Sequence, residues 1–195
     1  MKRFYIFLIC FITTTVSAQQ VLRDSVYVKT SIFEVMYSEK YEQPLWVKYT
    51  VQCPEGTASR KGMNFYVCDS IKTSDNNDYV HNIYDKGHMA PAADFSCDND
   101  ILYQTFTYLN CALQHQDLNR GVWKTLETYE RILSSVNPTV TVEIRCVFSE
   151  NSIKLPSGAT VPDGFIKIIR YKNEVKRFYF KNEKPIESDI MKYII

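Results

Sequence analysis

The sequence of 195 residues lacks several features that would assign it quickly to a class of protein. It has no excess of basic residues, because 23 Lys and Arg are balanced by 22 Asp and Glu. It has no internal repeat, no low-complexity tract and no linker rich in proline or serine. Any phosphate-binding surface must therefore be local, and we expect the chain to form one compact domain.

A second long apolar run is also missing after the first residues of the chain, so we expect no membrane anchor. The exception is the start, where Lys2 and Arg3 precede an apolar run over residues 4–16 and the small residues Ser17 and Ala18. This order is typical of a secretory signal peptide. We therefore expect a leader over residues 1–18 and a single exported domain over residues 19–195, located in the periplasm or outside the cell.

The cysteines lack the C-x-x-C spacing of zinc sites and redox motifs, so we expect no structural zinc. Cys10 lies in the expected leader, and five cysteines follow it: Cys53, Cys68, Cys97, Cys111 and Cys146. An odd number in an exported protein allows at most two disulfides and leaves one thiol over. The spacing does not decide which cysteines pair.

Alternating apolar and polar residues with many aromatic and β-branched side chains predict strands, whereas polar caps and 3.6-residue periodicity predict helices. The predicted strands cover residues 32–37, 44–52, 140–148, 164–171 and 174–180, with a short one at 65–68 in the loop-rich stretch 57–77. The predicted helices cover 98–109 and 119–136, and 172–173 joins a hairpin. The fold class is therefore α+β, with helices inserted in a mixed, mainly antiparallel sheet.

The most informative short stretch is Asp85-Lys86-Gly87-His88-Met89-Ala90-Pro91, which follows the strand-like residues 79–84. Gly87 permits an unusual backbone turn and Pro91 stops a strand, so we expect His88 to be displayed at a bend and not within a ladder. A histidine can accept a proton near neutral pH, as the activation of water against a phosphodiester requires. Taken alone, a histidine beside a turn is more often structural.

A second pattern runs along the predicted helix 119–136. Asn119, Trp123, Glu127 and Arg131 recur every four residues, so one helix face would present an amide, an indole, a carboxylate and a guanidinium. Asn119 offers a hard oxygen ligand for magnesium, and Arg131 offers fixed positive charge for a transition state. Spacing alone favours an ordinary helix, in which Asn119 is the N-cap, Glu127 and Arg131 form a salt bridge and Trp123 belongs to the core.

Together the two stretches resemble the DNA/RNA non-specific endonuclease family, whose ββα-metal site combines a DRGH-type motif with an asparagine-bearing helix. The motif is present here as residues 85–91, and the helix as Leu118-Asn119-Arg120-Gly121-Val122-Trp123 followed by Leu126-Glu127. The similarity is strongest over residues 84–131 and continues through residues 161–182. It implies that His88 is the general base, that Asn119 is the magnesium ligand, and that Glu127 and Arg131 support the metal's waters and the transition state.

Three further positions follow from the resemblance. Lys86 stands where the family usually has arginine. The lysine ammonium would bind a phosphate less rigidly than the planar guanidinium of an arginine, which can donate two parallel hydrogen bonds. Asn110 matches an asparagine that touches or braces the site. The family also carries an arginine before the motif, for which this chain offers Arg60 or Lys61.

The resemblance implies a magnesium-dependent endonuclease, with manganese able to substitute, that hydrolyses DNA and RNA independently of base sequence. Two alternatives stay open at this stage. One is a nucleic-acid-binding or partner-binding module that keeps the fold without turnover, and the other is a disulfide-stapled exported binding domain unrelated to nucleases. We expect the other histidines, His81 and His115, to have surface or structural roles.

Overall fold

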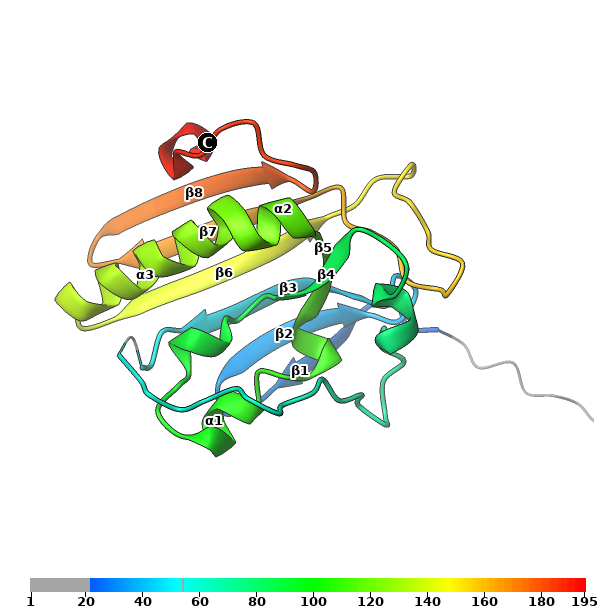
Figure 1. Cartoon of the computed structure of the whole chain (residues 1–195), viewed down its shortest axis with the longest axis horizontal. Coiled ribbons are helices and arrows are strands. Elements are labelled where there is room, and N and C mark those ends of the chain that lie inside the picture. Colours follow the sequence, from blue (N-terminus) through cyan, green and yellow to red (C-terminus); the bar gives the residue numbers. More distant parts are fainter. Residues whose placement is uncertain (1–21, 54) are drawn as a thin grey trace, which may run out of the picture.

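A computed structural model of the chain describes residues 22–53 and 55–195, so the expected leader over residues 1–18 lies outside the described residues. The fold is built on a six-stranded antiparallel sheet in the order β1-β2-β3-β6-β7-β8 (Figure 1). Its strands are β1 (Val26–Lys29), β2 (Phe33–Ser38), β3 (Gln43–Thr50), β6 (Val140–Val147), β7 (Gly164–Tyr171) and β8 (Glu174–Lys181). The α+β prediction is confirmed, and β1 is the strand of this sheet that the pattern missed.

A separate antiparallel pair joins β4 (Tyr84–His88) to β5 (Cys111–His115). The α-helical and π-helical elements are α1 (Asn99–Tyr103), α2 (Gln116–Leu118), the π-helical turn η4 (Asn119–Trp123) and α3 (Lys124–Val136). Short 3-10 turns complete the fold: η1 (Asn76–Tyr79), η2 (Ala92–Asp94), η3 (Tyr108–Asn110) and η5 (Ile190–Tyr193). Among the described residues, no helix has the length and apolar character needed to span a membrane.

The core lies between the large sheet and the helical segment 116–136, which runs along β6 and β7 (Figure 1). Alternation along β6 buries Val140, Val142 and Ile144 on the covered face. Trp123 is fully buried against Phe165 and Phe180, with ring centroids 5.5 and 5.7 Å away. Burying such large aromatic surfaces anchors the helical segment to the sheet.

Several predicted elements match the structure closely. The strands predicted at 44–52, 140–148, 164–171 and 174–180 agree with β3, β6, β7 and β8 to within two residues, and the hairpin turns at Lys172, which has a φ of 50°. Residues 57–77 are mostly loop, as expected. The short strand predicted at 65–68 is reduced to one bridge between Tyr66 and Thr107.

Two other predictions were wrong. Residues 79–84 are not a strand, because the chain turns through His81, with a φ of 59°, and β4 begins only at Tyr84. The helix predicted at 98–109 has the expected Asp98 cap but ends at Tyr103. Two residues later, the Thr105 carbonyl accepts a hydrogen bond from the Asn110 side chain, and this contact replaces the next helical turn.

Candidate active site

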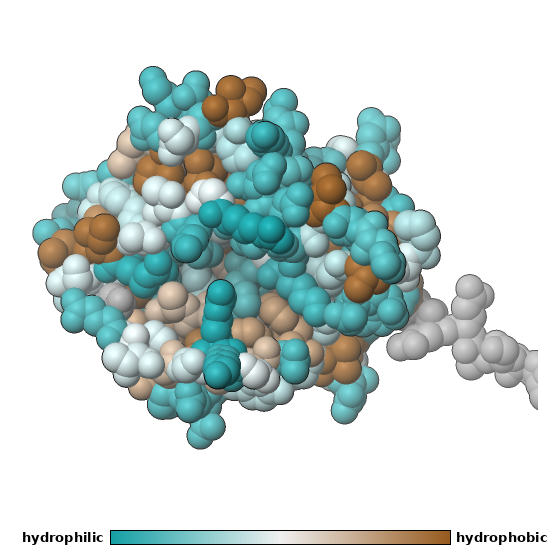
Figure 2. Space-filling view, viewed as in Figure 1, coloured by the Kyte–Doolittle hydropathy of each residue, from teal (hydrophilic) through white to brown (hydrophobic). Residues whose placement is uncertain are grey.

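A cleft of about 720 Å³ opens on the face shown in Figure 2, where teal side chains lie above a hollow and paler, tan surface lies below it. Four separate parts of the chain line this cleft. Its lining residues are Gly56, Ala58, Arg60, Met63, Phe65, Lys86, His88, Pro91, Ala92, Ala93, Ser96, Leu102, Phe106, Asn119, Arg120, Lys124, Glu127 and Arg131. Five of the six predicted site residues therefore lie on one cleft, and Asn110 is the exception.

His88 is the last residue of β4, paired with Cys111 of β5, so the expectation that it lies outside a ladder was wrong. Gly87 also has a different role from the one expected. Its φ is not positive, but a Cβ there would lie 2.5 Å from the Gln114 side-chain oxygen. Glycine is therefore needed for the close approach of β4 to a buried side chain on β5.

Asn110 braces the chain directly after His88. Its side-chain oxygen accepts a hydrogen bond from the Ala90 backbone amide at 2.7 Å, and its amide nitrogen donates to the Ala90 carbonyl at 2.9 Å. The Met89 backbone amide also donates to the Asn110 carbonyl at 2.9 Å. Asn110 is fully buried and absent from the cleft lining, so it fixes the chain directly after His88.

The His88 imidazole lies between two aromatic rings, with centroids 4.7 Å from Phe65 and 4.8 Å from Phe106. Its buried Nε2 atom has no hydrogen-bond partner among the described residues. Burial, together with the nearby charge of Arg60, lowers the pKa of His88 to about 3. The imidazole is therefore neutral at neutral pH, which is the state in which it can accept a proton.

Lys86 is held on the same strand by an aromatic cage. Its Nζ atom lies 5.4 to 5.8 Å from the ring centroids of Phe65, Tyr79 and Tyr108. The ammonium also donates a hydrogen bond to the Asn76 side-chain oxygen at 2.8 Å. Cation–π contacts and one hydrogen bond thus fix a flexible side chain as a point of positive charge at the cleft.

Asn119 lies on the opposite wall of the cleft. Its amide nitrogen donates to an Asp85 carboxylate oxygen at 2.9 Å, which leaves the amide oxygen as the free end of the group. Arg120 binds the same carboxylate through two nitrogens at 2.6 and 2.8 Å. Asp85 of the motif therefore orients the asparagine, whose amide oxygen is a group that could bind a metal ion.

Asn119 is not the N-cap that simple spacing favoured. The helical segment begins three residues earlier at Gln116, where His115 caps it by accepting from the Asp117 backbone amide. Gly121 then has non-helical dihedral angles, with a φ of −100° and a ψ of −116°. This kink changes the periodicity, so Trp123 points into the core while Asn119 and the residues of α3 line the cleft.

Glu127 and Arg131 lie one turn apart on α3, yet the salt bridge that spacing favoured is replaced by another. Arg131 donates to Asp94 at 3.0 Å and to the Thr128 hydroxyl at 3.0 Å. Burial raises the pKa of Glu127 to about 7, and nearby Glu130 adds to this effect, whereas Lys167 and Arg131 oppose it. The carboxyl group therefore titrates near neutral pH, within the cleft.

A buried ionic network lies beneath this wall. Lys167 of β7 and Glu130 of α3 are both fully buried and form an ion pair at 2.8 Å, and the Lys167 ammonium lies 4.8 Å from the Trp123 ring centroid. Burial raises the pKa of Asp94, and Glu130 adds to this shift, whereas Lys167 and Arg131 lower it. The sequence did not predict this network, because a buried acidic residue in a loop, such as Asp94, leaves no periodic pattern of apolar and polar residues.

The structure also separates the two candidates for the upstream arginine. Arg60 lines the cleft and Lys61 does not. His81 is exposed and His115 is the helix cap described above, so neither histidine lies in the cleft lining. Both therefore have the surface or structural position that was expected.

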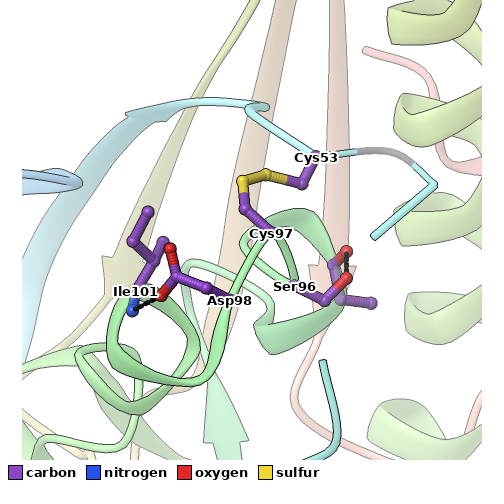
Figure 3. Close-up of a disulfide and its surroundings, with 6 residues drawn as sticks. Cys53, Ser96, Cys97, Asp98 and Ile101 are labelled. Atoms are coloured by element: carbon purple, nitrogen blue, oxygen red, sulfur yellow. Dashed lines mark hydrogen bonds between the residues drawn. A yellow bond between two sulfur atoms is a disulfide. The ribbon is translucent and has the colours of Figure 1, made fainter. Parts of the chain in front are cut away.

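A disulfide between Cys53 and Cys97 joins the two chain segments that contribute Gly56 and Ser96 to the cleft lining (Figure 3). Near it, the Ala58 amide donates to the Ser96 carbonyl at 3.0 Å. Gly56 packs so closely on Ser96 that a Cβ would lie 2.2 Å from the Ser96 carbonyl oxygen. Among the described residues, the cysteines Cys68, Cys111 and Cys146 are free thiols, so one bridge forms where at most two were expected.

Comparison with known proteins agrees with this arrangement. The sequence model of the family described as DNA/RNA non-specific endonuclease matches residues 14–190. Mitochondrial nuclease EXOG of Danio rerio is 32% identical over 103 residues, which are 50% of this chain and 30% of that protein. Mitochondrial endonuclease G of Bos taurus is 30% identical over 116 residues, which are 56% of this chain and 38% of that protein. The chain thus matches well under half the length of these relatives.

The fold itself has a solved counterpart. The crystal structure of the EndoG/EndoGI complex contains a chain that superposes with a TM-score of 0.79, covering 87% of this chain and 79% of that one at 22% sequence identity. At this identity, the superposition establishes a shared fold. The match of the family model covers most of the sequence, including the motif at residues 85–91 and the helical segment. The chain therefore belongs to the DNA/RNA non-specific endonuclease family.

Proposed function

We propose that the protein is a metal-dependent endonuclease that hydrolyses phosphodiester bonds in DNA and RNA with little dependence on base sequence. The observation that carries the proposal is the convergence of His88 with Asn119, Glu127 and Arg131 on one cleft, although β4 and the helical segment are separate in the sequence. Phosphate and sugar are the parts of a nucleic acid that carry no sequence information. A cleft with charged groups around one histidine is suited to binding phosphate and sugar.

The chain's own residues can carry out the proton transfer. Neutral His88 takes a proton from a water molecule as that water attacks phosphorus, the bond from phosphorus to the 3′ oxygen breaks, and the 3′ oxygen takes a proton from solvent water. Arg131, fixed by Asp94, stabilises the charge that develops on the phosphate oxygens. A phosphate beside His88 brings negative charge and raises the pKa of the imidazole from its low value. The products would carry 5′-phosphate ends.

The donor set of the cleft fits a largely hydrated magnesium ion. Magnesium binds through one or two oxygen ligands and keeps several waters, and the oriented Asn119 oxygen meets that requirement. Glu127 lies farther along the same wall, where it could accept hydrogen bonds from the waters. In the described part of the chain no three acidic, histidine or cysteine side chains gather as a metal cage. When bound, the ion would act as a Lewis acid on the phosphate, and manganese would substitute.

The test is degradation of plasmid DNA and RNA by residues 19–195, with magnesium or with EDTA. We expect cutting of both polymers with magnesium and none with EDTA. His88→Ala should lower the rate by about 100-fold or more, and His81→Ala, which changes an exposed histidine, should not. A folded wild-type protein that binds nucleic acid but cuts neither polymer with any divalent ion would instead support the binding module.

We also propose that the protein acts outside the cytoplasm, in the periplasm or beyond the cell. The expected leader and the Cys53–Cys97 disulfide support this location, since disulfides persist in oxidising compartments. The measurement is the mass of the protein recovered from each cell fraction. An exported protein would begin near Gln19 and carry the disulfide, whereas a cytoplasmic product of full length would overturn the proposal.

A further inference from the structure

The two walls of the cleft differ in chemistry. One wall carries Asn119, Arg120, Lys124, Glu127 and Arg131, all from the helical segment 116–136. The other wall is mainly apolar, with Arg60 as its charged residue. Its apolar part is a small cluster apart from the main core, in which Ala58, Met63 and Phe65 pack on Ala92, Leu102 and Phe106.

All six residues of this cluster line the cleft, and we call them the apolar wall. Figure 2 shows the contrast as tan surface beneath the hollow and hydrophilic side chains above it. Met63 and Phe65 are only partly buried, so their apolar surface faces solvent inside the cleft. Phosphodiester hydrolysis needs charge, a proton acceptor and a metal ligand, and the apolar side chains of this wall supply none of these, although Phe65 helps to hold Lys86.

The apolar wall nevertheless reaches the reacting groups. Phe65 and Phe106 of this wall contact the His88 ring, and Lys86 lies 5.7 Å from the Phe65 ring centroid. A ligand whose phosphate lies beside His88 and Arg131 would therefore place its next group against the apolar wall. In a nucleic acid, the group beside the phosphate and sugar is a flat, aromatic base.

We infer that the apolar wall is a nucleobase subsite, and that the protein consequently prefers single-stranded DNA and RNA to duplexes. This inference rests on the proposed nuclease function. Apolar and aromatic side chains bind unpaired bases of any sequence, because every base presents a π face. The whole cleft, with a volume of about 720 Å³, has room for a phosphate and a base together.

A duplex cannot use this subsite without disruption, because its bases are paired and stacked inside the helix. Extruding one base costs the pairing and stacking that a single strand has already lost. Charge alone predicts the opposite preference, since a duplex carries more phosphates per unit length and binds basic surfaces more strongly. Strand preference therefore distinguishes the apolar wall from simple electrostatic binding.

The experiment measures binding in EDTA, where no cutting occurs, by fluorescence anisotropy. Three probes of one sequence are used at one salt concentration: a single strand, its duplex, and a single strand in which the bases are replaced by abasic sites. We expect the single strand to bind most tightly and the abasic strand to lose about tenfold in affinity. A duplex that binds as tightly as the single strand, or an abasic strand that binds as tightly as the intact one, would overturn the inference.

A matched pair of variants locates the effect. Met63→Ser removes apolar surface from the wall and should lower affinity for the intact strand by about fivefold, with no change for the abasic strand. Val67→Ser is the control, because Val67 is 50% exposed on the same chain segment but does not line the cleft. Equal losses for the intact and abasic strands in Met63→Ser would also overturn the inference. If nucleic acid is cut without strand preference, only the subsite fails, whereas the proposed function fails if none is cut.

Discussion

The charged wall and the apolar wall of the cleft are held in place by different means. The charged wall stands on the helical segment 116–136, with the buried Glu130–Lys167 ion pair beneath it and Asp94 fixing Arg131. The apolar wall is formed largely by loops, which a disulfide and one small apolar cluster hold together. Groups that meet the reacting phosphate need fixed positions, and regular elements provide them better than loops do. A wall that accepts any base can tolerate looser geometry.

Among the variants of the two walls, Arg131→Ala on the charged wall should lower activity most. The change removes fixed positive charge at the phosphate, so kcat/KM on an oligonucleotide should fall by about 100-fold. It also leaves fully buried Asp94 without its cation, which should cost about 2 to 3 kcal/mol of stability. Steady-state kinetics and urea unfolding measure the two losses separately.

Arg145→Ala is the control for Arg131→Ala, because Arg145 pairs with Glu143 on β6 and lies outside the cleft. It should leave both kcat/KM and stability nearly unchanged, as exposed ion pairs contribute little. Wild-type kcat/KM in Arg131→Ala would show that the charged wall does not act on the phosphate.

The next effect concerns the disulfide that holds the apolar wall. Replacing Cys53 and Cys97 together by serine removes the link between the loops, and should lower the free energy of unfolding by about 2 to 4 kcal/mol. Calorimetry of the oxidised protein and of this double variant measures the difference. Equal melting temperatures would mean that the bridge does not stabilise the wall.

A smaller effect is expected for Lys86, which lies where the two walls meet. Lys86→Ala removes a point charge that the aromatic cage positions, so KM for nucleic acid should rise about tenfold while the fold is kept. Lys61→Ala changes a lysine outside the cleft and should leave KM unaltered. If Lys86→Ala and Lys61→Ala have the same KM for nucleic acid, Lys86 does not contact phosphate.

The smallest effect is a pair of opposed pH dependences, measured by urea unfolding in EDTA. The His88 pKa is lowered from 6.5 to about 3, so the unfolded chain binds the extra proton between these values and stability falls as pH falls below 6.5. The Glu127 pKa is raised from 4.5 to about 7, so its contribution falls as pH rises from 4.5 to 7.

Single variants separate these two contributions. His88→Ala should flatten the decrease in stability at low pH, and Glu127→Gln should flatten the decrease between pH 4.5 and 7. If neither variant changes the slope of stability against pH, the two groups titrate normally in the folded protein and the description of their burial is wrong.

Much of the fold was predictable because its strands alternate regularly and its long helix carries an apolar stripe. The four residues His88, Asn119, Glu127 and Arg131 were also predictable, through a motif and a spacing that bring together chemistry suited to phosphate. The structure places all four on one cleft. Local patterns alone favoured ordinary structural roles for these residues, and the resemblance of the two stretches to the family brought them together as a site.

The remaining features depend on contacts between distant parts of the chain. Trp123 belongs to the core, as simple spacing favoured, but the kink at Gly121 that separates it from the face of Asn119 had no sequence signal. The helix after Asp98 was cut short where the Asn110 side chain donates to the Thr105 carbonyl. The partner of Arg131 proved to be Asp94, in a loop whose sequence has no period. The pairing of Cys53 with Cys97 likewise could not follow from spacing.

The most direct test of the account is single-turnover cleavage of an oligonucleotide by His88→Ala with magnesium, with and without added imidazole. The account predicts that cutting falls by about 100-fold or more and that imidazole restores part of it, since a small base can enter the space left between Phe65 and Phe106. Undiminished cutting by His88→Ala would contradict the central claim. The claim would also be contradicted if added imidazole accelerated cutting by His88→Ala no more than it accelerates cutting by His81→Ala.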